Sequence, residues 1–176
     1  MTINEVLART RAGGVAHAEL TAERRGTGRV RFTGIVDFDR GLTTLEREEP
    51  ADRPLWVELT GTEVGLTAGG EPEERVVLEE WAGRDIGRSG AGLLSLLDAV
   101  AGRAVPAGDE EIALDRPLAW ACAVTRTVTG IPVRGRALRV AVAPDGRLAC
   151  VEVLEQGRVR RRTAVTHALR LFDWRA

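Results

Sequence analysis

The sequence contains no lysine and no tyrosine, and its 25 basic residues are all arginine. Aromatic residues make up only 4% of the chain, so there is no row of rings on which nucleic acid bases could stack. The formal net charge of −1 gives no basic field that would attract a polyanion, and no acidic tail is present. We therefore expect no nucleic acid partner.

Cysteine and histidine are also scarce, with two residues of each kind. Cys122 and Cys150 do not form a C-x-x-C pair, and His17 and His167 have no Cys, Asp or Glu at metal-ligand spacing. We predict no metal site and no cofactor. The cysteines are interpreted as small buried thiols. A single disulfide between neighbouring strands in an oxidising compartment is the alternative.

Long hydrophobic runs are missing as well. No stretch approaches the roughly 20 apolar residues of a membrane-spanning helix, and the first residues, MTINEVLARTRAGG, lack the apolar core of a signal peptide. As written, the sequence indicates a cytoplasmic protein without a transmembrane segment. If an export signal has been removed, the alternative is the cell envelope.

Catalytic patterns are absent too. Ser89 and Ser95 lie in no G-x-S-x-G motif, and the acidic pairs are adjacent in sequence, which in extended chain turns their carboxylates to opposite faces. The Gly90–Gly92 turn lacks the lysine and the parallel βαβ frame of a phosphate-binding loop. Arg158, Arg160 and Arg162 share a strand face, interpreted as a charged outer surface, with phosphate or lipid head-group binding as the alternative.

The chain does contain enough apolar residues, 44% of the total, to form one hydrophobic core. At 176 residues it is interpreted as a single domain, 1–176, able to bury about 70% of its unfolded surface. Residues 29–39 alternate most clearly, with Val30, Phe32, Val36 and Phe38 on one side and Gly34 marking a bend or bulge. The remaining alternating stretches predict strands over 15–24, 42–48, 55–60, 61–70, 76–81, 118–129, 136–143, 147–154 and 158–174.

Two segments have a helical period instead. Thr2 and Glu5 form a capping-box pair ahead of a short N-terminal helix. In residues 90–105, GAGLLSLLDAVAGRAV, the apolar positions 93, 96, 97 and 100 make one stripe. Tight turns between most strands indicate an antiparallel sheet. The prediction is therefore an α+β fold: a curved antiparallel half-barrel with a short N-terminal helix and the central helix covering its concave face.

If the central helix stands off from the sheet, a hydrophobic cavity opens between them, and if it packs fully, the interior is plain core. The bulky residues expected around that cavity come from the strands and from the central helix. The candidate ligand-binding residues are Phe32, Phe38, Trp56, Leu93, Leu94, Leu97 and Trp120.

The order of these parts resembles a known family. A short helix leads into VRFTGIVDFDRG, a central GLLSLLDAVAG helix follows, and a C-terminal meander carries RALRVAVAPDGRLACVEV. This pattern is similar to the LolA superfamily of lipoprotein carriers and the LppX/LprG-type lipid-binding lipoproteins. The resemblance implies a curved half-barrel with helices across its mouth and a cavity for an acyl chain or a similar ligand.

Three hypotheses of function follow. The first is a non-enzymatic carrier or sensor that binds a hydrophobic or amphipathic, lipid-like ligand, with Leu93, Leu94 and Leu97 of a lid helix touching it. The second is a protein-interaction module with a filled core and no ligand pocket. The third, an enzyme that uses a cavity Asp or Glu as acid or base, has no motif in its support.

Overall fold

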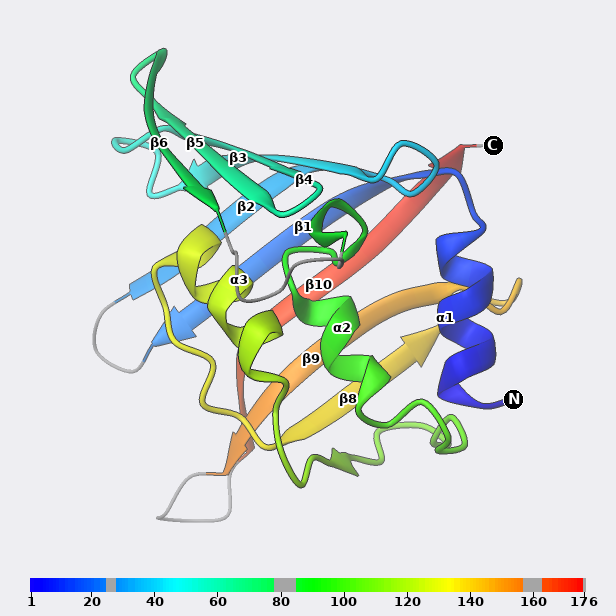
Figure 1. The fold of residues 1–176 in the computed structure, drawn as a ribbon. Coiled ribbons are helices and arrows are strands. Elements are labelled where there is room, and N and C mark those ends of the chain that lie inside the picture. The colour runs from blue at the N-terminus through cyan, green and yellow to red at the C-terminus, as the bar shows by residue number, and fades with distance from the viewer. Residues whose placement is uncertain (25–27, 78–84, 157–162, 176) are drawn as a thin grey trace.

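The computed structural model describes residues 1–24, 28–77, 85–156 and 163–175. Within these residues the fold is α+β: ten antiparallel strands form one open sheet, and three α-helices lie on one of its faces (Figure 1). The fold class expected from the sequence is confirmed. The strands are β1 (Val15–Arg24), β2 (Gly28–Asp37), β3 (Leu42–Glu49), β4 (Leu55–Thr60), β5 (Glu63–Ala68), β6 (Glu71–Val77), β7 (Ile112–Ala113), β8 (Ala137–Val142), β9 (Leu148–Gln156) and β10 (Thr163–Arg175).

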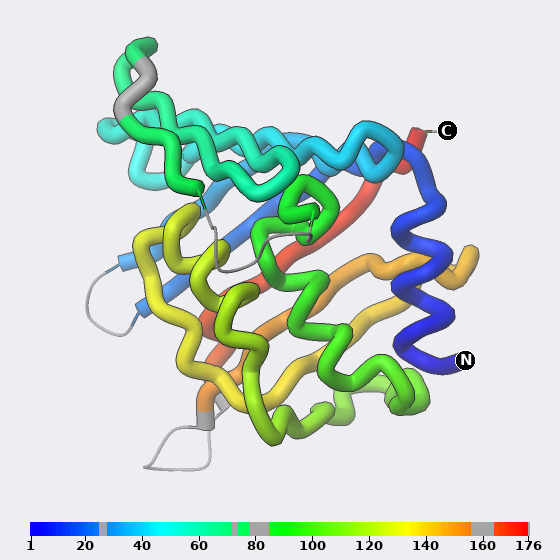
Figure 2. Tube along the Cα trace, in the orientation of Figure 1, coloured from blue at the N-terminus to red at the C-terminus, as the bar shows by residue number. Residues whose placement is uncertain are grey.

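The sheet consists of two meanders, one formed by β1 to β6 and the other by β7 to β10. The pairing of the first strand, β1, with the last strand, β10, joins them. The strand order is β6-β5-β4-β3-β2-β1-β10-β9-β8-β7, so the first and last strands are neighbours near its middle. In Figure 2, β10 in red lies between β1 in blue and β9 in orange. Their pairing sets Leu20 opposite Leu169 and His17 opposite Phe172. The two halves of the chain therefore share one core rather than forming separate sheets.

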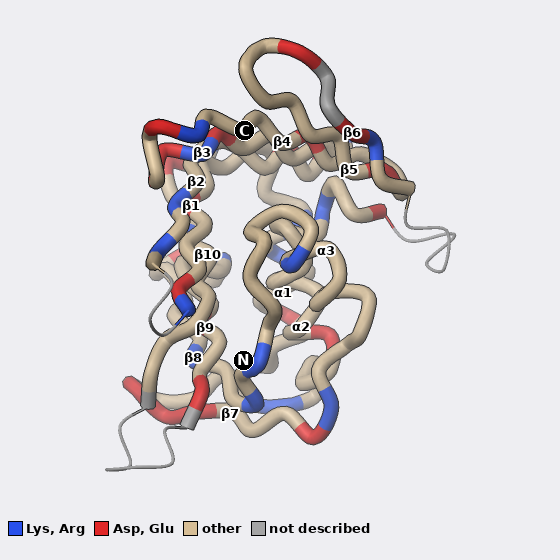
Figure 3. Tube along the Cα trace, turned by 90° about the vertical axis from the view of Figure 1, so that its left-hand side faces the viewer, with Lys and Arg blue, Asp and Glu red and all other residues tan. Residues whose placement is uncertain are grey.

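The sheet is bent rather than flat. In Figure 3 the strands β1, β2, β8, β9 and β10 stand as a wall, β3 to β6 turn over its top, and the helices occupy the angle between them. Gly34 lies on β2 opposite Leu45 of β3. A Cβ atom added at Gly34 would overlap the carbonyl oxygen of Thr44, so glycine permits the close approach of the two strands. The bend or bulge predicted at Gly34 has a nearby counterpart, because the register of β2 and β3 shifts between Arg31 and Phe32.

The N-terminal helix α1 (Ile3–Arg11) has the expected capping box, in which Thr2 Oγ1 accepts from the Glu5 backbone N–H and Glu5 accepts from that of Thr2. Its buried residues pack into the core, and Thr10 ties it to the sheet. The Thr10 hydroxyl donates to the Val6 carbonyl at 2.7 Å and accepts from the Leu148 N–H at 2.8 Å. One buried hydroxyl thus satisfies groups on both α1 and β9.

The central helix is shorter than predicted. Helix α2 spans Leu93–Asp98, and residues 99–102 continue as turns rather than as helix. Leu93, Leu94, Leu96 and Leu97 are each 0% exposed. The 3-10 helix η2 (Ile86–Arg88) precedes α2 and is fixed to β3 by the Thr43 hydroxyl, which donates to the Gly87 carbonyl at 2.6 Å.

The strand predicted over 118–129 is wrong. These residues form helix α3 (Ala119–Thr129), which ends at Gly130 in the left-handed conformation, φ 71°. Its buried positions 120, 121, 124, 125 and 128 follow the helical period, although apolar residues also alternate along the segment. The Thr125 hydroxyl donates to the carbonyl of Ala121 and to that of Ala91, so α3 is held against the turn before α2.

Two smaller differences concern the far end of the sheet. Residues 71–74, which lie between the strands predicted over 61–70 and 76–81, belong to strand β6. The strand predicted over 76–81 is described only to Val77, and the rest lies outside the described residues. No helix in the described part of the chain has the length and apolarity needed to cross a membrane.

Candidate functional site

Six of the seven candidate ligand-binding residues lie together in the interior. Phe32 of β2, Phe38 of the turn after β2, the three candidate leucines of α2 and Trp120 of α3 all belong to one buried cluster, with Trp120 the most exposed at 4%. Phe32 and the leucines are 0% exposed. Of these six residues, only Trp120 lines one of the five main hollows of the described residues. In this structure the angle between the helices and the sheet is therefore filled by side chains.

Trp56 does not join this group. Along β4 the exposure alternates, with Val57 and Leu59 at 0% and Trp56 at 45%. Because alternate strand residues point to opposite faces, Trp56 lies on the face of the sheet away from the helices. Its placement in a cavity under the helices is thus a wrong prediction. We call the side away from the helices the outer face, and no helix of the described chain covers it (Figure 3).

The outer face carries a second aromatic group beside Trp56. Phe172 of β10 is 44% exposed and stacks on His17 of β1, with ring centroids 5.9 Å apart. The strand registers place His17 opposite Ile35 of β2, and Ile35 opposite Thr44 of β3. Four strands thus carry a continuous row of side chains on this face, and Trp56 lies on the next strand along.

A hollow of about 400 Å³ lies between Trp56 on one side and His17 with Phe172 on the other. We call it the outer hollow. It is open to solvent, and none of the described arginines lines it. The residues around it are His17, Ala18, Thr33, Gly34, Ile35, Thr44, Glu46, Trp56 and Phe172.

An ion-pair network borders the outer hollow. The Glu19 carboxylate forms ion pairs with the guanidinium groups of Arg31 and Arg170, with nitrogen-to-oxygen distances of 2.9 and 3.2 Å. Arg31 also forms an ion pair with Glu48 at 3.4 Å. Glu19 is mostly covered, with 16% of its side chain exposed. A carboxylate shared by two arginines holds strands β1, β2 and β10 in fixed relation next to the aromatic residues.

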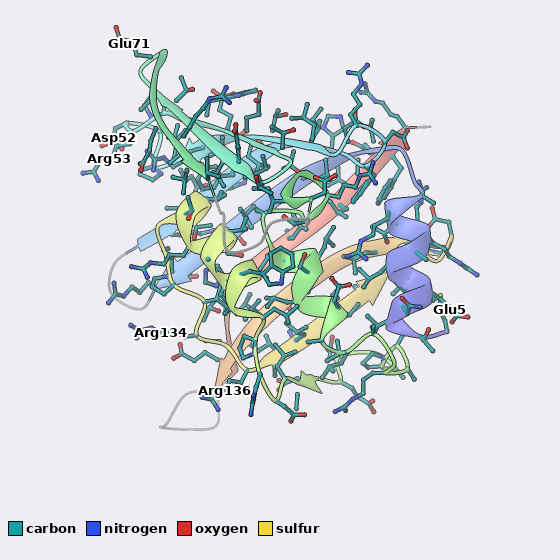
Figure 4. The ribbon with its side chains drawn as sticks, viewed as in Figure 1. Glu5, Asp52, Arg53, Glu71, Arg134 and Arg136 are labelled. Atoms are coloured by element: carbon teal, nitrogen blue, oxygen red, sulfur yellow. The ribbon has the colours of Figure 1, made fainter. Side chains whose placement is uncertain are left out.

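A second pair of hollows lies at the end of the sheet near the segment between α3 and β8. Their volumes are about 510 and 550 Å³, and both are lined by Arg134 and Glu155. We call them the end hollows. One adds Ile131, Pro132 and Val165, and the other adds Leu114, Leu154 and Arg136. Figure 4 labels Arg134 and Arg136 at this edge.

His167 is buried beside the first end hollow. It is 0% exposed, and its Nε2 lies 3.1 Å from the Ile131 carbonyl oxygen, which can only accept, so Nε2 carries the proton. Burial lowers the pKa of His167, and the hydrogen bond to Ile131 opposes this only in part. A neutral imidazole thus anchors the segment after α3 to the sheet. Among the described residues no group of His, Cys, Asp and Glu could hold a metal ion.

Both cysteines are free thiols. Cys122 lies on α3 and Cys150 on β9, so they are not on neighbouring strands, as the disulfide alternative required. Burial raises the pKa of each thiol, and at Cys150 the charge of Glu152 adds to this effect. Both are therefore less ionised than an exposed cysteine at neutral pH.

The Gly90–Gly92 turn has a packing role. Ser89 Oγ accepts from the Gly92 N–H at 3.0 Å, and a Cβ atom at Gly92 would overlap the Ala121 carbonyl oxygen. The turn thus lets α2 approach α3 closely, and its Gly92 donor is used inside the protein. The arginines 158, 160 and 162 lie outside the described residues, so their predicted face is not tested.

The chain was also compared with known proteins. No model of a protein family, including the enzyme families, matches it, and no curated protein matches it either. The resemblance to the LolA superfamily therefore stays a prediction based on the order of the elements.

Sequence reasoning identified Trp56 as a candidate residue but missed its neighbours His17, Ile35 and Phe172. The signal that could have found them is the alternation of β1 and β2, which leaves His17 and Ile35 opposite to the buried positions. Phe172 could not be added without knowing that β10 pairs with β1.

Proposed function

We propose that this protein is a non-enzymatic binding module that recognises a protein partner through the outer face of its sheet. The observation that carries the proposal is the pair of exposed aromatic residues, Trp56 and Phe172, on either side of the outer hollow. Aromatic side chains are enriched at protein interfaces, where their large apolar area is removed from water.

The filled interior supports this proposal over a ligand cavity beneath the helices. The leucines of α2 are already buried against the sheet, so a ligand there would have to displace them. The outer face needs no rearrangement, because its strands pair continuously from β10 to β4 and the Glu19 network fixes their side chains. A rigid surface loses little conformational entropy on binding.

The experiment is affinity capture from the host, with the wild-type protein and three variants as baits. Trp56→Ala and Phe172→Ala remove the outer aromatic groups, and Val77→Ala, at a position 48% exposed on β6, is the matched control. We expect a partner that the wild type and the control retain and both outer-face variants lose. Capture that is equal for all four baits would contradict the proposal.

As a second candidate we propose the binding of a lipid-like, amphipathic ligand. It is supported by the end hollows, whose volumes fall in the range of about 300–1,000 Å³ that is typical of ligand sites and whose lining combines apolar side chains with Arg134. In a LolA-like version of this candidate, α2 would move off the sheet and Leu93, Leu94 and Leu97 would touch the ligand.

Native mass spectrometry of protein purified gently from its host tests the second candidate. A co-purifying mass that disappears on denaturation would support it and would give the ligand class. If the mass is that of the chain alone and an environment-sensitive hydrophobic dye does not bind, the ligand proposal fails.

A further inference from the structure

The Trp56 side of the outer hollow is acidic. Glu46 of β3 is the direct cross-strand partner of Trp56 on β4, and Glu58 lies two residues further along β4 on the same face. Cross-strand partners lie about 5 Å apart at Cβ, and positions i and i+2 share a strand face. Two carboxylates therefore flank the indole ring, one across the ladder and one along the strand.

These two carboxylates have no ion pair or hydrogen bond within the described part of the chain, in contrast with their neighbours. Glu19, Glu48 and Glu49 all contact Arg31. Arg47 follows Glu46 directly, but its Nε donates to the Arg53 carbonyl at 2.6 Å. Within the part of the chain that the structure describes, the negative charge is therefore compensated on the Glu19 side of the outer hollow and left uncompensated around Trp56.

The indole itself is accessible, and an exposed Trp face is the aromatic surface that best attracts a cation. Among the described residues, no arginine lines the outer hollow, so none of them places a cation there. A ring between two free carboxylates favours a guanidinium or an ammonium group and repels an acidic one.

We infer that the outer hollow binds a segment of a partner protein that carries an arginine or lysine side chain, with its cation on Trp56 between Glu46 and Glu58. This inference rests on the proposed function and adds the chemistry of the partner. The stem of the basic side chain contacts the floor at Thr44 and Ile35, and an apolar neighbour in the segment reaches His17 and Phe172.

The test uses a random peptide library displayed on phage and selected on the full chain. We expect selected peptides to contain arginine or lysine next to an apolar residue. Their synthetic versions should bind about tenfold more weakly to Trp56→Ala and to Trp56→Leu, and about fivefold more weakly to the double variant Glu46→Gln/Glu58→Gln. Trp56→Leu keeps the apolar bulk and removes the ring, so it separates attraction between cation and ring from simple burial.

The matched control is Asp109→Asn/Glu110→Gln, which neutralises two exposed carboxylates in a loop remote in sequence from β3 and β4. It should bind the peptides like the wild type. The unfolding midpoint of each variant is measured first. If Trp56→Ala is destabilised, Trp56→Leu and the glutamine pair still decide the question.

Each other result overturns the inference in a distinguishable way. If the selected peptides require Trp56 for binding but are neutral or acidic, the inference of a basic partner segment is wrong and the proposed function stands. The same holds if their affinity is unchanged by the glutamine substitutions. A selection that yields no peptide dependent on Trp56 or Phe172 overturns both. If sedimentation shows that the wild-type chain is a dimer and that Trp56→Ala is a monomer, a second copy of the chain occupies the outer hollow. The inference of a basic partner segment is then wrong.

Discussion

The same strands present two different surfaces. On the inner face, Leu20 of β1 and Phe32 of β2 are 0% exposed under the helices. On the outer face, the alternate residues of these strands include His17, Glu19 and Ile35, which line or border an open hollow. The inner face is an apolar core in which the side chains pack against one another and the helices. The outer face combines aromatic side chains with charges, some paired and some free, as recognition surfaces do.

The largest expected effect is on the inner face. Leu97→Ala removes a fully buried side chain from the contact between α2 and the sheet, and we expect the free energy of unfolding to fall by about 2–5 kcal/mol. Urea unfolding at unchanged slope measures it. A loss below about 1 kcal/mol would show that α2 packs loosely, which would break the contrast between the faces and favour the ligand-carrier candidate.

The close approach of β2 and β3 at Gly34 comes next. Gly34→Ala would place a Cβ atom onto the Thr44 carbonyl, so β3 must move away from β2. We expect the free energy of unfolding to fall by about 1–3 kcal/mol. Gly61→Ala is not a clean control, because Gly61 has φ 55°, whereas Gly102 has open space and no such backbone conformation. Gly102→Ala should leave the unfolding midpoint nearly unchanged, and an equal loss in both variants would contradict the packing explanation.

A smaller effect depends on pH and on His167. Burial lowers its pKa in the folded protein below the ordinary value of 6.5, so the unfolded chain binds the proton more readily. Stability is therefore complete above about pH 6.5 and falls as the pH drops toward the folded pKa, by at most about 1.4 kcal/mol per pH unit. His167→Gln should remove this component of the acid sensitivity, and His17→Gln on the outer face should retain it. Thermal unfolding at pH 5 and pH 8 compares the variants, and an unchanged acid response in His167→Gln would contradict the assignment.

The smallest effect on stability is expected on the outer face itself. Trp56→Ala and Phe172→Ala change side chains that are almost half exposed, and each should alter the free energy of unfolding by no more than about 1 kcal/mol. Binding of a partner should nevertheless be lost. If either variant instead unfolds like Leu97→Ala, its ring is part of the fold, and the contrast between a structural inner face and a binding outer face does not hold.

Much of the sheet could be predicted, because alternation reports which residues of a strand are buried. The segments β1, β2 and β4 follow that rule, as does the capping box that begins α1. The segment 118–129 could not be assigned in this way, since Ala, Val and Trp are apolar at positions that fit both periods. In the structure this segment is a helix whose Thr125 hydroxyl donates to the Ala91 carbonyl, a contact remote in sequence that local spacing cannot reveal. Trp56, by contrast, could have been placed correctly from the sequence, because the alternation along β4 puts it on the face opposite to Val57 and Leu59.

By itself the sequence determined the fold class, the two-faced character of its strands and the absence of a recognisable catalytic motif, because these depend on composition and on spacing along a single segment. Only the tertiary structure decided that the interior is filled and that Trp56, Glu46, His17 and Phe172 surround one hollow. Those residues come from β4, β3, β1 and β10, and their meeting depends on the pairing of the first strand with the last. The sequence alone does not show which distant strands pair, because the backbone groups that form the hydrogen bonds are nearly the same at every residue. The pairing becomes visible only in the folded sheet.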